Sequence, residues 1–196
     1  SAQASVSNIN GNSASAVHNY SVDSSAPTII INTVASDNIV NASEADTGVT
    51  VSGSTTAEAG QIVTVTLNSP TVQTYQATVQ ADGSWSINIP AADLAALTDG
   101  SHTLTATVND KAGNPASTTH NLAVDLTVPV LTINTIAGDD IINAAEHGQA
   151  LVISGSSTGG EAGDVVTVTL NSKTYTTTLD ASGNWSVGVP AADVSA

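Results

Sequence analysis

The sequence predicts an all-β chain of tandem, seven-stranded antiparallel β-sandwiches arranged in line, and three observations carry this prediction. Aliphatic residues alternate with Thr and Ser along many short segments, which is the period of a half-buried strand. Ser, Thr, Asn and Gly supply turns, and the apolar residues are mostly Val, Ile, Leu and Ala, with no Phe or Met. Long stretches also recur further along the chain at a spacing of about 100 residues, the length of one sandwich domain.

The complete repeat, between Pro27 and Asp125, contains seven segments of this kind. Alternation is plainest in residues 63–67 and 104–108, where aliphatic residues on one face alternate with Thr on the other. In chain order, the expected strands cover residues 28–34, 49–54, 62–68, 74–80, 85–89, 102–108 and 117–124.

Turn and helix signals complete this repeat. Asp82-Gly83 lies between two alternating runs and predicts a hairpin turn. Pro90 opens the segment 90–97 at a suitable first helical position, so we expect one or two helical turns there and no helix elsewhere. Trp85 recurs as Trp185, and both indoles are expected at equivalent core positions.

The repeat divides the chain into three parts. Residues 1–25 align with residues 103–127 at an offset of 102, so they are expected to be the last two strands of a preceding repeat. Residues 26–126 form a complete repeat, and residues 127–196 form a repeat that lacks its last two strands. We therefore expect either an excerpt from a longer array, or a chain whose residues 1–25 complete the last repeat of another copy.

Composition excludes several classes of function. A net charge of −15 repels phosphate backbones and anionic lipid headgroups, so neither a nucleic-acid partner nor membrane insertion is expected. The absence of Cys excludes disulfides, zinc-thiolate sites and Cys nucleophiles. No apolar run approaches the roughly 20 residues of a membrane span. Cations are therefore the natural partners.

Acidic and amide residues gather in the loops at both ends of the predicted sandwich. Because an odd number of antiparallel strands brings the chain in at one end and out at the other, successive repeats would set two such clusters against each other. Carboxylates, amide oxygens and backbone carbonyls are the ligands of Ca²⁺, and Asx-turns without an ion are the alternative. The candidate metal ligands are Asp23, Asp37, Asn38, Glu44, Asp110, Asp125, Asp139, Asp140 and Glu146.

Catalysis is not expected. Asp99, Ser101 and His102 lie close together, but a turn leading into a strand cannot arrange them as a Ser-His-Asp triad. His18 and His120 are equivalent positions of the repeat, and each is expected to be a hydrogen-bonded strand histidine rather than a metal ligand.

Several motifs together resemble a known family. They are Asp-Asn-Ile-Val-Asn-Ala-Ser-Glu at 37–44, Asp-Gly-Ser-Trp-Ser at 82–86 and Asn-Asp-Lys-Ala-Gly-Asn at 109–114. With the Asp-x-x-x-Pro joints at Asp23 and Asp125, they resemble the bacterial immunoglobulin-like repeats of giant, type I-secreted, biofilm-associated adhesins.

This resemblance implies tandem immunoglobulin-like sandwiches that act as a calcium-rigidified extender on the bacterial cell surface, outside the cell. Neighbouring repeats would be the direct partners, and other parts of the parent protein would meet a host or matrix surface. The family's calcium ligands carry over best to Asp23, Asp37, Asp110, Asp125 and Asp139.

One position departs from the family pattern, because Asn8 stands where the complete repeat has Asp110. Two other functions remain open from the sequence. One is a carbohydrate-binding, lectin-like module, which exposed aromatic platforms would support. The other is a fibre subunit that assembles by strand donation.

Overall fold

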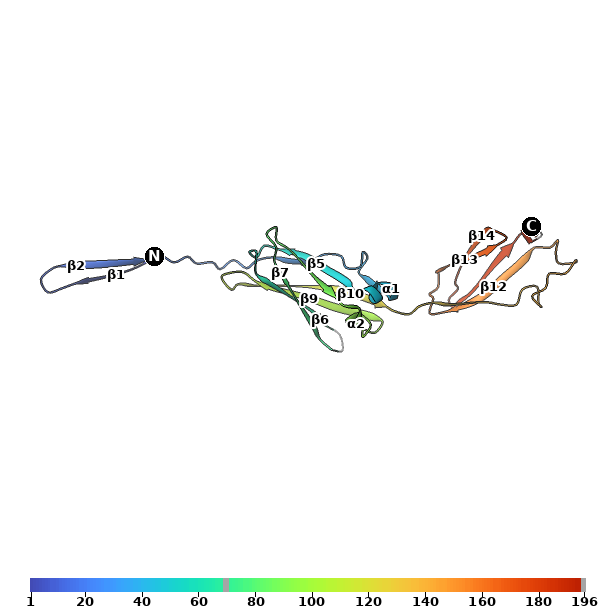
Figure 1. Cartoon of the computed structure of the whole chain (residues 1–196), viewed down its shortest axis with the longest axis horizontal. Coiled ribbons are helices and arrows are strands. Elements are labelled where there is room, and N and C mark those ends of the chain that lie inside the picture. Colours follow the sequence, from blue (N-terminus) through green and yellow to red (C-terminus); the bar gives the residue numbers. More distant parts are fainter. Residues whose placement is uncertain (69–70, 195–196) are drawn as a thin grey trace. The chain divides into compact units, whose positions relative to one another are not determined.

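The computed structural model describes residues 1–68 and 71–194, and the chain forms two compact units, Ser1–Asp125 and Leu126–Ala196. Strands dominate both units, which confirms the predicted all-β class (Figure 1). The first unit contains β1 (Ala2–Ser7), β2 (Ser13–His18), β3 (Ile29–Ile31), β4 (Ile39–Asn41), α1 (Ala42–Thr47), β5 (Val49–Thr55), β6 (Ile62–Asn68), β7 (Gln73–Thr78), β8 (Ser84–Ile89), α2 (Ala91–Leu94), β9 (Gly100–Asn109) and β10 (Pro115–Asp125). The second unit contains β11 (Val130–Ile133), β12 (Leu151–Thr158), β13 (Val165–Leu170), β14 (Lys173–Thr178), β15 (Asn184–Val189) and α3 (Ala191–Val194).

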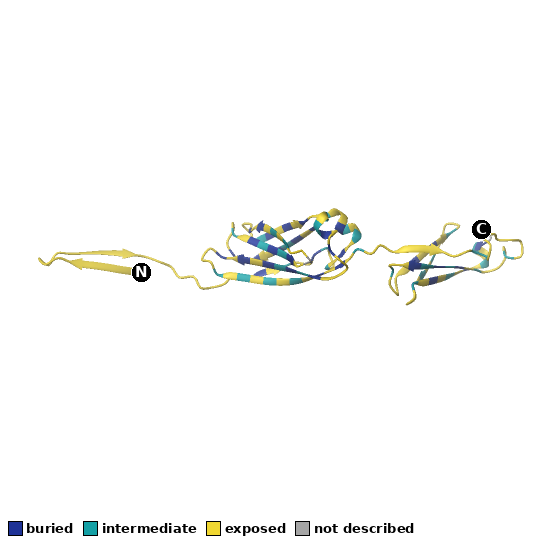
Figure 2. Cartoon of the chain, turned by 90° about the horizontal axis from the view of Figure 1, so that it is seen from below, coloured by how far each residue is buried: buried dark blue, intermediate teal, exposed yellow. Residues whose placement is uncertain are grey.

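The sandwich of the first unit has two sheets, one in the order β3-β5-β8 and the other in the order β4-β10-β9-β6-β7. Their inner faces share one aliphatic core, in which Val51, Val65 and Leu104 are fully buried. Figure 2 shows the resulting alternation of buried and exposed residues along the strands. Since each buried Val or Leu contributes about 1.5–3 kcal/mol, this core is the main source of stability.

A glycine and a tryptophan face each other at the centre of the β5-β8 pair. Gly53 pairs with Trp85, and a Cβ atom on Gly53 would lie 2.0 Å from the backbone oxygen of Ile30 and 2.4 Å from the indole. Gly155 and Trp185 repeat this arrangement in the second unit. The indoles are 2% and 3% exposed, which confirms their predicted equivalent positions in the core.

The first predicted strand, residues 28–34, is shorter than expected. It forms only β3, and a further strand, β4, pairs in parallel with β10. The described residues from β3 to β10 thus hold eight strands with one parallel pair, instead of seven antiparallel strands. Positive φ angles at Ala35, Ser36 and Asn38 turn the chain out of the first sheet, so that it joins the second.

The prediction that helix is limited to residues 90–97 was wrong. Helix α2 lies within that range, but α1 forms as well. A capping box explains α1, because Asn41 Oδ1 accepts the backbone N–H of Glu44 and the Glu44 carboxylate accepts the backbone N–H of Asn41. Ala45 supplies the buried contact of this short helix.

Strands β1 and β2 form a separate two-stranded hairpin, and every residue from 1 to 26 is exposed. Ala2 pairs with His18 in this hairpin, and Leu104 pairs with His120 between β9 and β10. These pairs are related by the sequence offset of 102, so β1-β2 has the register of β9-β10.

The second unit contains one sheet in the order β11-β12-β15 and a two-stranded sheet, β13-β14. Its core is formed by a smaller set of side chains that includes Ile153, Val166 and Trp185. The described residues of this unit, 126–194, hold counterparts of β3 and of β5 to β8, and counterparts of β9 and β10 are not among these residues. Within the described part of the whole chain, no helix has the length and apolar character that a bilayer span requires.

Candidate functional site

The turn between β9 and β10 brings together oxygen atoms from two distant parts of the first unit. The side-chain nitrogen of Asn114 donates to Asp110 Oδ2 at 2.8 Å, and it lies 3.3 Å and 3.4 Å from the backbone oxygens of Asp23 and Ser25. Three oxygens therefore converge on one amide nitrogen. We call Asp110, Asn114 and the backbone oxygens of Asp23 and Ser25 the β9-β10 oxygen cluster.

The sequence of the turn explains its local shape. The backbone N–H of Asn114 donates to Asp110 Oδ1 at 2.7 Å, and Gly113 adopts a φ of 96° that closes the turn. Asp110 is only 8% exposed. Hydrogen bonds from the Asn114 side chain and from backbone amides of the turn hold the pKa of Asp110 below its ordinary value. The carboxylate is thus charged and fixed in position.

Glu58 adds a second carboxylate beside this turn. Its Oε2 accepts the backbone N–H of Lys111, the residue after Asp110, at 2.9 Å. Glu58 and Asn114 are not among the metal ligands predicted from the sequence, although both lie in loops at the same end of the predicted sandwich. That shared position was the signal in the sequence that could have identified them.

Asp23 takes part in the cluster through its backbone, while its carboxylate caps a local turn by accepting the N–H of Ser25 at 3.0 Å. The structure therefore brings together two of the predicted ligands, Asp23 and Asp110. The oxygen chemistry fits Ca²⁺, which takes carboxylate, amide and backbone oxygens. Within the described residues, no group of three or more His, Cys, Asp or Glu side chains could hold a metal ion.

The loop before β4 uses its polar side chains locally. Asp37 Oδ1 accepts the N–H of Ile39 at 2.9 Å, and Asn38 Oδ1 accepts the N–H of Val34 at 2.9 Å. Nε2 of His120 lies 2.7 Å from the same Asn38 oxygen, which confirms His120 as a hydrogen-bonded strand histidine. These contacts are the Asx-turns that the sequence left open as the alternative to an ion.

Glu44 and Asp125 lie at the end of the first unit where β10 finishes. Glu44 closes the capping box of α1, and Asp125 pairs with Asn41 in the β4-β10 register. In the second unit, Asp139, Asp140 and Glu146 make the same local contacts, accepting the N–H groups of Ile141, Ile136 and Asn143 respectively.

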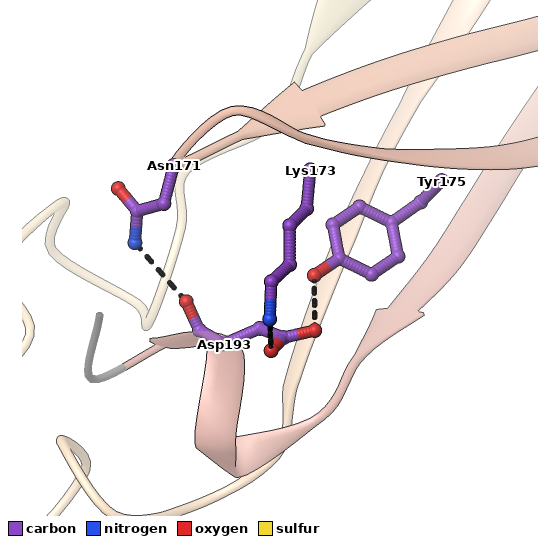
Figure 3. A network of polar contacts seen from close by, with 4 residues as sticks. All are labelled: Asn171, Lys173, Tyr175 and Asp193. Carbon is purple, nitrogen blue, oxygen red and sulfur yellow. Dashed lines mark hydrogen bonds and ion pairs between the residues drawn. The ribbon is translucent and has the colours of Figure 1, made fainter.

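In the second unit, a tyrosine of β14 and an aspartate of α3 hold the helix against the strand (Figure 3), a contact that we call the Tyr-Asp clip. Tyr175 donates to Asp193 Oδ2 at 2.7 Å, Lys173 forms an ion pair with the same carboxylate, and Asn171 donates to the backbone oxygen of Asp193 at 3.0 Å. The bond to Asp193 is the largest cause that raises the pKa of Tyr175 to about 12. Lys173 and then Tyr175 lower the pKa of Asp193.

The same clip holds α2 in the first unit. Tyr75 donates to Asp93 Oδ2 at 2.7 Å, and burial together with this bond raises the pKa of Tyr75 well above its ordinary value. The lysine is replaced by Gln73 at the corresponding position. The clip therefore has a structural role that both units share.

A polar hollow adjoins each core tryptophan. The hollow beside Trp185 has a volume of about 410 Å³ and that beside Trp85 about 370 Å³, and Ser, Thr and Asn side chains line both. Each indole is buried, and its N–H has no partner. The tryptophans thus offer no exposed platform of the kind that a lectin-like module would use.

Two of the residues considered for a catalytic triad, His102 and Ser101, make structural contacts in the sandwich. His102 is buried, and its Nε2 lies 2.8 Å from the backbone oxygen of Thr98. Ser101 pairs with Ala123 in the β9-β10 ladder.

The chain is similar to repeat domains of large adhesins. A family model for the bacterial Ig-like domain matches residues 32–126. A Ca²⁺-stabilized adhesin that helps an Antarctic bacterium reach out and bind ice is 39% identical, with 97% of this chain and 48% of the adhesin chain covered and a TM-score of 0.50. The chain thus spans about half the length of that structure.

Two further structures are similar in sequence. A 1.5-MDa bacterial ice-binding adhesin, described for its retention on the host cell surface, is 38% identical over 98% of this chain and 64% of its own, with a TM-score of 0.49. An immunoglobulin-like domain from the M. primoryensis ice-binding adhesin is 39% identical over 50% of this chain and 96% of its own, with a TM-score of 0.38. No curated protein matches the chain.

Proposed function

This chain belongs to the bacterial Ig-like domain family, as its motifs predicted, and from that premise we propose that it is a run of calcium-stabilised extender repeats of a large bacterial surface adhesin. It is related to domains of an adhesin, and that relationship supports a structural role in adhesion. The relative of 39% identity is Ca²⁺-stabilized, which makes Ca²⁺ the first ion to consider for this chain.

The observation that carries the calcium proposal is the β9-β10 oxygen cluster. Asp110 is charged and nearly buried, and the backbone oxygens of Asp23 and Ser25 lie around the same Asn114 nitrogen. A Ca²⁺ ion bound by Asp110 and these backbone oxygens would tie the segment that leads into the sandwich to the turn at its end. Glu58 would add charge from the neighbouring loop.

The overall charge favours the same ion. The chain has 17 acidic residues and two basic ones, so folding concentrates negative charge that a divalent cation would offset. Extracellular calcium modules commonly bind at about 0.1–1 mM, so the ion would be bound outside the cell and released inside. Binding would then favour folding after export, through a type I system, by mass action.

The rest of the proposed role follows from repetition. Domains of one kind in series would project an adhesive tip away from the cell, and neighbouring repeats would be the direct partners. Contact with a host or matrix surface, and a role in biofilm formation, would belong to other parts of the parent protein. Asp37, Asn38, Glu44, Asp125, Asp139, Asp140 and Glu146 remain further proposed ligands.

Calcium titration followed by calorimetry tests the central point. A calcium concentration ten times the dissociation constant should raise the melting midpoint of the first unit by roughly 5–10 °C, because binding to the folded state alone stabilises it by about 1.4 kcal/mol. Asp110→Asn should abolish most of this increment, since it removes the carboxylate of the cluster.

Asp82→Asn is the matched control. Asp82 also accepts a backbone N–H within a turn, that of Ser84, but it lies in the β7-β8 turn. This variant should keep the whole calcium increment. Equal increments in the wild type and Asp110→Asn would show that the β9-β10 turn binds no stabilising calcium.

A further inference from the structure

The side-chain nitrogen of Asn114 lies at the centre of the β9-β10 oxygen cluster. It donates to Asp110 Oδ2 at 2.8 Å and lies 3.3 Å and 3.4 Å from the backbone oxygens of Asp23 and Ser25. An amide NH2 group has donors only, and it is the positive end of the side-chain dipole. This NH2 group therefore lies among the three oxygens in the way that a cation would.

The turn between β9 and β10 closes without these side-chain contacts. The backbone N–H of Asp110 donates to the backbone oxygen of Asn114 at 3.0 Å, and the N–H of Asn114 donates to Asp110 Oδ1 at 2.7 Å. The turn from Asp180 to Asn184 has the same Asp-x-x-Gly-Asn sequence and the same two bonds, at 2.8 Å and 2.9 Å. Within the described part of the chain, no oxygen of a distant segment is bonded to the Asn184 side chain. The convergence of oxygens on Asn114 is therefore an addition to the turn.

The backbone of Asn114 is fixed, and its side chain can still rotate. Its N–H and C=O are both bonded to Asp110, and Pro115 follows it and restricts its backbone angles. The last torsion of an Asn side chain has two broad minima, which exchange the NH2 group and the oxygen while the shape is kept. Rotation about this torsion would bring Asn114 Oδ1 to the place of the nitrogen.

We propose that the Asn114 amide substitutes for calcium in the β9-β10 oxygen cluster and gives way to the ion. Without calcium, the NH2 group holds Asp110 and the backbone oxygens of Asp23 and Ser25 together, so the cluster stays assembled. With calcium, the amide rotates and Asn114 Oδ1 joins the oxygens that hold the ion. This role of Asn114 rests on the proposed function, because it concerns the same calcium site.

The number of donors explains why the NH2 group gives way. An amide nitrogen has two N–H groups, so it cannot donate fully to three oxygens. Two of its contacts, at 3.3 Å and 3.4 Å, accordingly exceed the usual hydrogen-bond distance of about 2.7–3.2 Å. A divalent cation attracts every oxygen around it, and Ca²⁺ takes about six to eight. The ion therefore satisfies these oxygens better than the amide does.

Asn114→Asp tests this role, because it replaces the NH2 group by an oxygen of nearly the same shape. Without calcium, the new carboxylate repels Asp110, so the melting midpoint of the first unit in EGTA should fall by about 4–8 °C. With calcium, the new carboxylate is a ligand, so the dissociation constant should fall about tenfold. Isothermal titration calorimetry of the whole chain measures this constant for the binding step that Asp110→Asn removes.

Two further variants separate the ligand from the donor and from charge. Asn114→Ala removes the amide altogether, so it should weaken calcium binding about tenfold. Ala112→Asp adds the same charge to the same turn and keeps the amide, so it should tighten binding by at most about threefold at physiological salt. Equal gains in Ala112→Asp and Asn114→Asp would overturn the proposal. So would weaker calcium binding in Asn114→Asp, which would show that Asn114 acts only as a hydrogen-bond donor.

Nuclear magnetic resonance of the side-chain amides follows the rotation itself. The NH2 hydrogens of Asn114 lose their bond to Asp110 on rotation, so their exchange with water should speed up about fivefold when calcium is added. The NH2 group of Asn184 is the internal reference and should not change. Calcium binding without this change at Asn114, or with equal dissociation constants in the wild type, Asn114→Ala and Asn114→Asp, would refute the role of Asn114 alone. A wild-type chain without the binding step at Asp110 would refute the proposed function as well.

Discussion

At the scale of single residues, several residues recur at equivalent positions in both units, and each of them makes the same close contact in the two units. Gly53 and Gly155 leave room for an indole, and Tyr75 and Tyr175 each donate to an aspartate at the start of a short helix. These contacts depend on the atoms of one or two residues. Single substitutions should therefore test them separately.

Gly155→Ala should destabilise the second unit by about 1–3 kcal/mol or more. Its Cβ atom would lie 1.9 Å from the backbone oxygen of Thr132 and 2.7 Å from the indole of Trp185, so strand and ring must both move. Gly188→Ala is the control in the paired strand, because nothing lies within 4 Å of the added atom. Native-state hydrogen exchange of the β12 amides would measure the difference, and equal protection in the two variants would refute this account.

The stability of the second unit should fall as the pH rises from about 10 to 12. The Tyr175 pKa is raised from 10.0 to about 12 by its bond to Asp193, so the unfolded chain loses this proton first. The stabilisation is complete below the unfolded pKa and is lost on passing through the folded pKa. Thermal unfolding at several pH values should show this fall, and Tyr175→Phe should reduce it.

At the scale of elements, α1 depends on its first turn more than on burial. It is six residues long and has one buried residue, Ala45, so the capping box supplies much of its stability. Asn41 also ends β4, which links the helix to the parallel pair with β10. The helix and the extra strand therefore share Asn41.

Asn41→Ala should cost about 1 kcal/mol, the usual effect of losing a helix cap. Ser43→Ala, at an exposed position inside the same turn, is the control and should change stability little. Hydrogen exchange of the α1 amides, together with the melting midpoint of the first unit, would measure both effects. Similar results for the two variants would argue against the capping box as the source of stability.

At the scale of the whole molecule, the proposed calcium binding leads to a prediction about how freely the two units would move. The first unit ends at Asp125, whose backbone pairs with Asn41 beside Glu44. Like charges near a domain boundary repel by about 1 kcal/mol per close pair in water, rising to about 4 kcal/mol where partly buried. A divalent ion would reverse the sign of this term.

Small-angle scattering should therefore show a narrower distribution of dimensions with calcium than with chelator. Asp125→Ser should remove much of this difference, and Asp82→Ser, in the β7-β8 turn, should not. Scattering curves that overlay with and without calcium, together with unchanged melting, would leave the Asx-turns as the whole explanation of these acidic loops.

Much of this protein could be read from local patterns in the sequence. Alternation of aliphatic residues with Thr predicted β6 and β9. Successive side chains of a strand point to opposite faces, so this alternation buries the aliphatic residues and exposes Thr. An offset of 100 placed Trp185, and an offset of 102 predicted that residues 1–25 are equivalent to β9 and β10. The capping box also has a signal in the sequence, because Asn41 is followed three residues later by Glu44.

Long-range pairing could not be read in this way. β4 is a strand because β10 lies beside it, and its counterpart at residues 141–143 has nearly the same sequence but no partner and no strand. The oxygen cluster joins backbone atoms of Asp23 and Ser25 to Asn114, which lies 91 and 89 residues away. Every residue has a backbone oxygen, so the sequence does not indicate which of these oxygens lie near Asp110. Only the packing of the complete sandwich decides this.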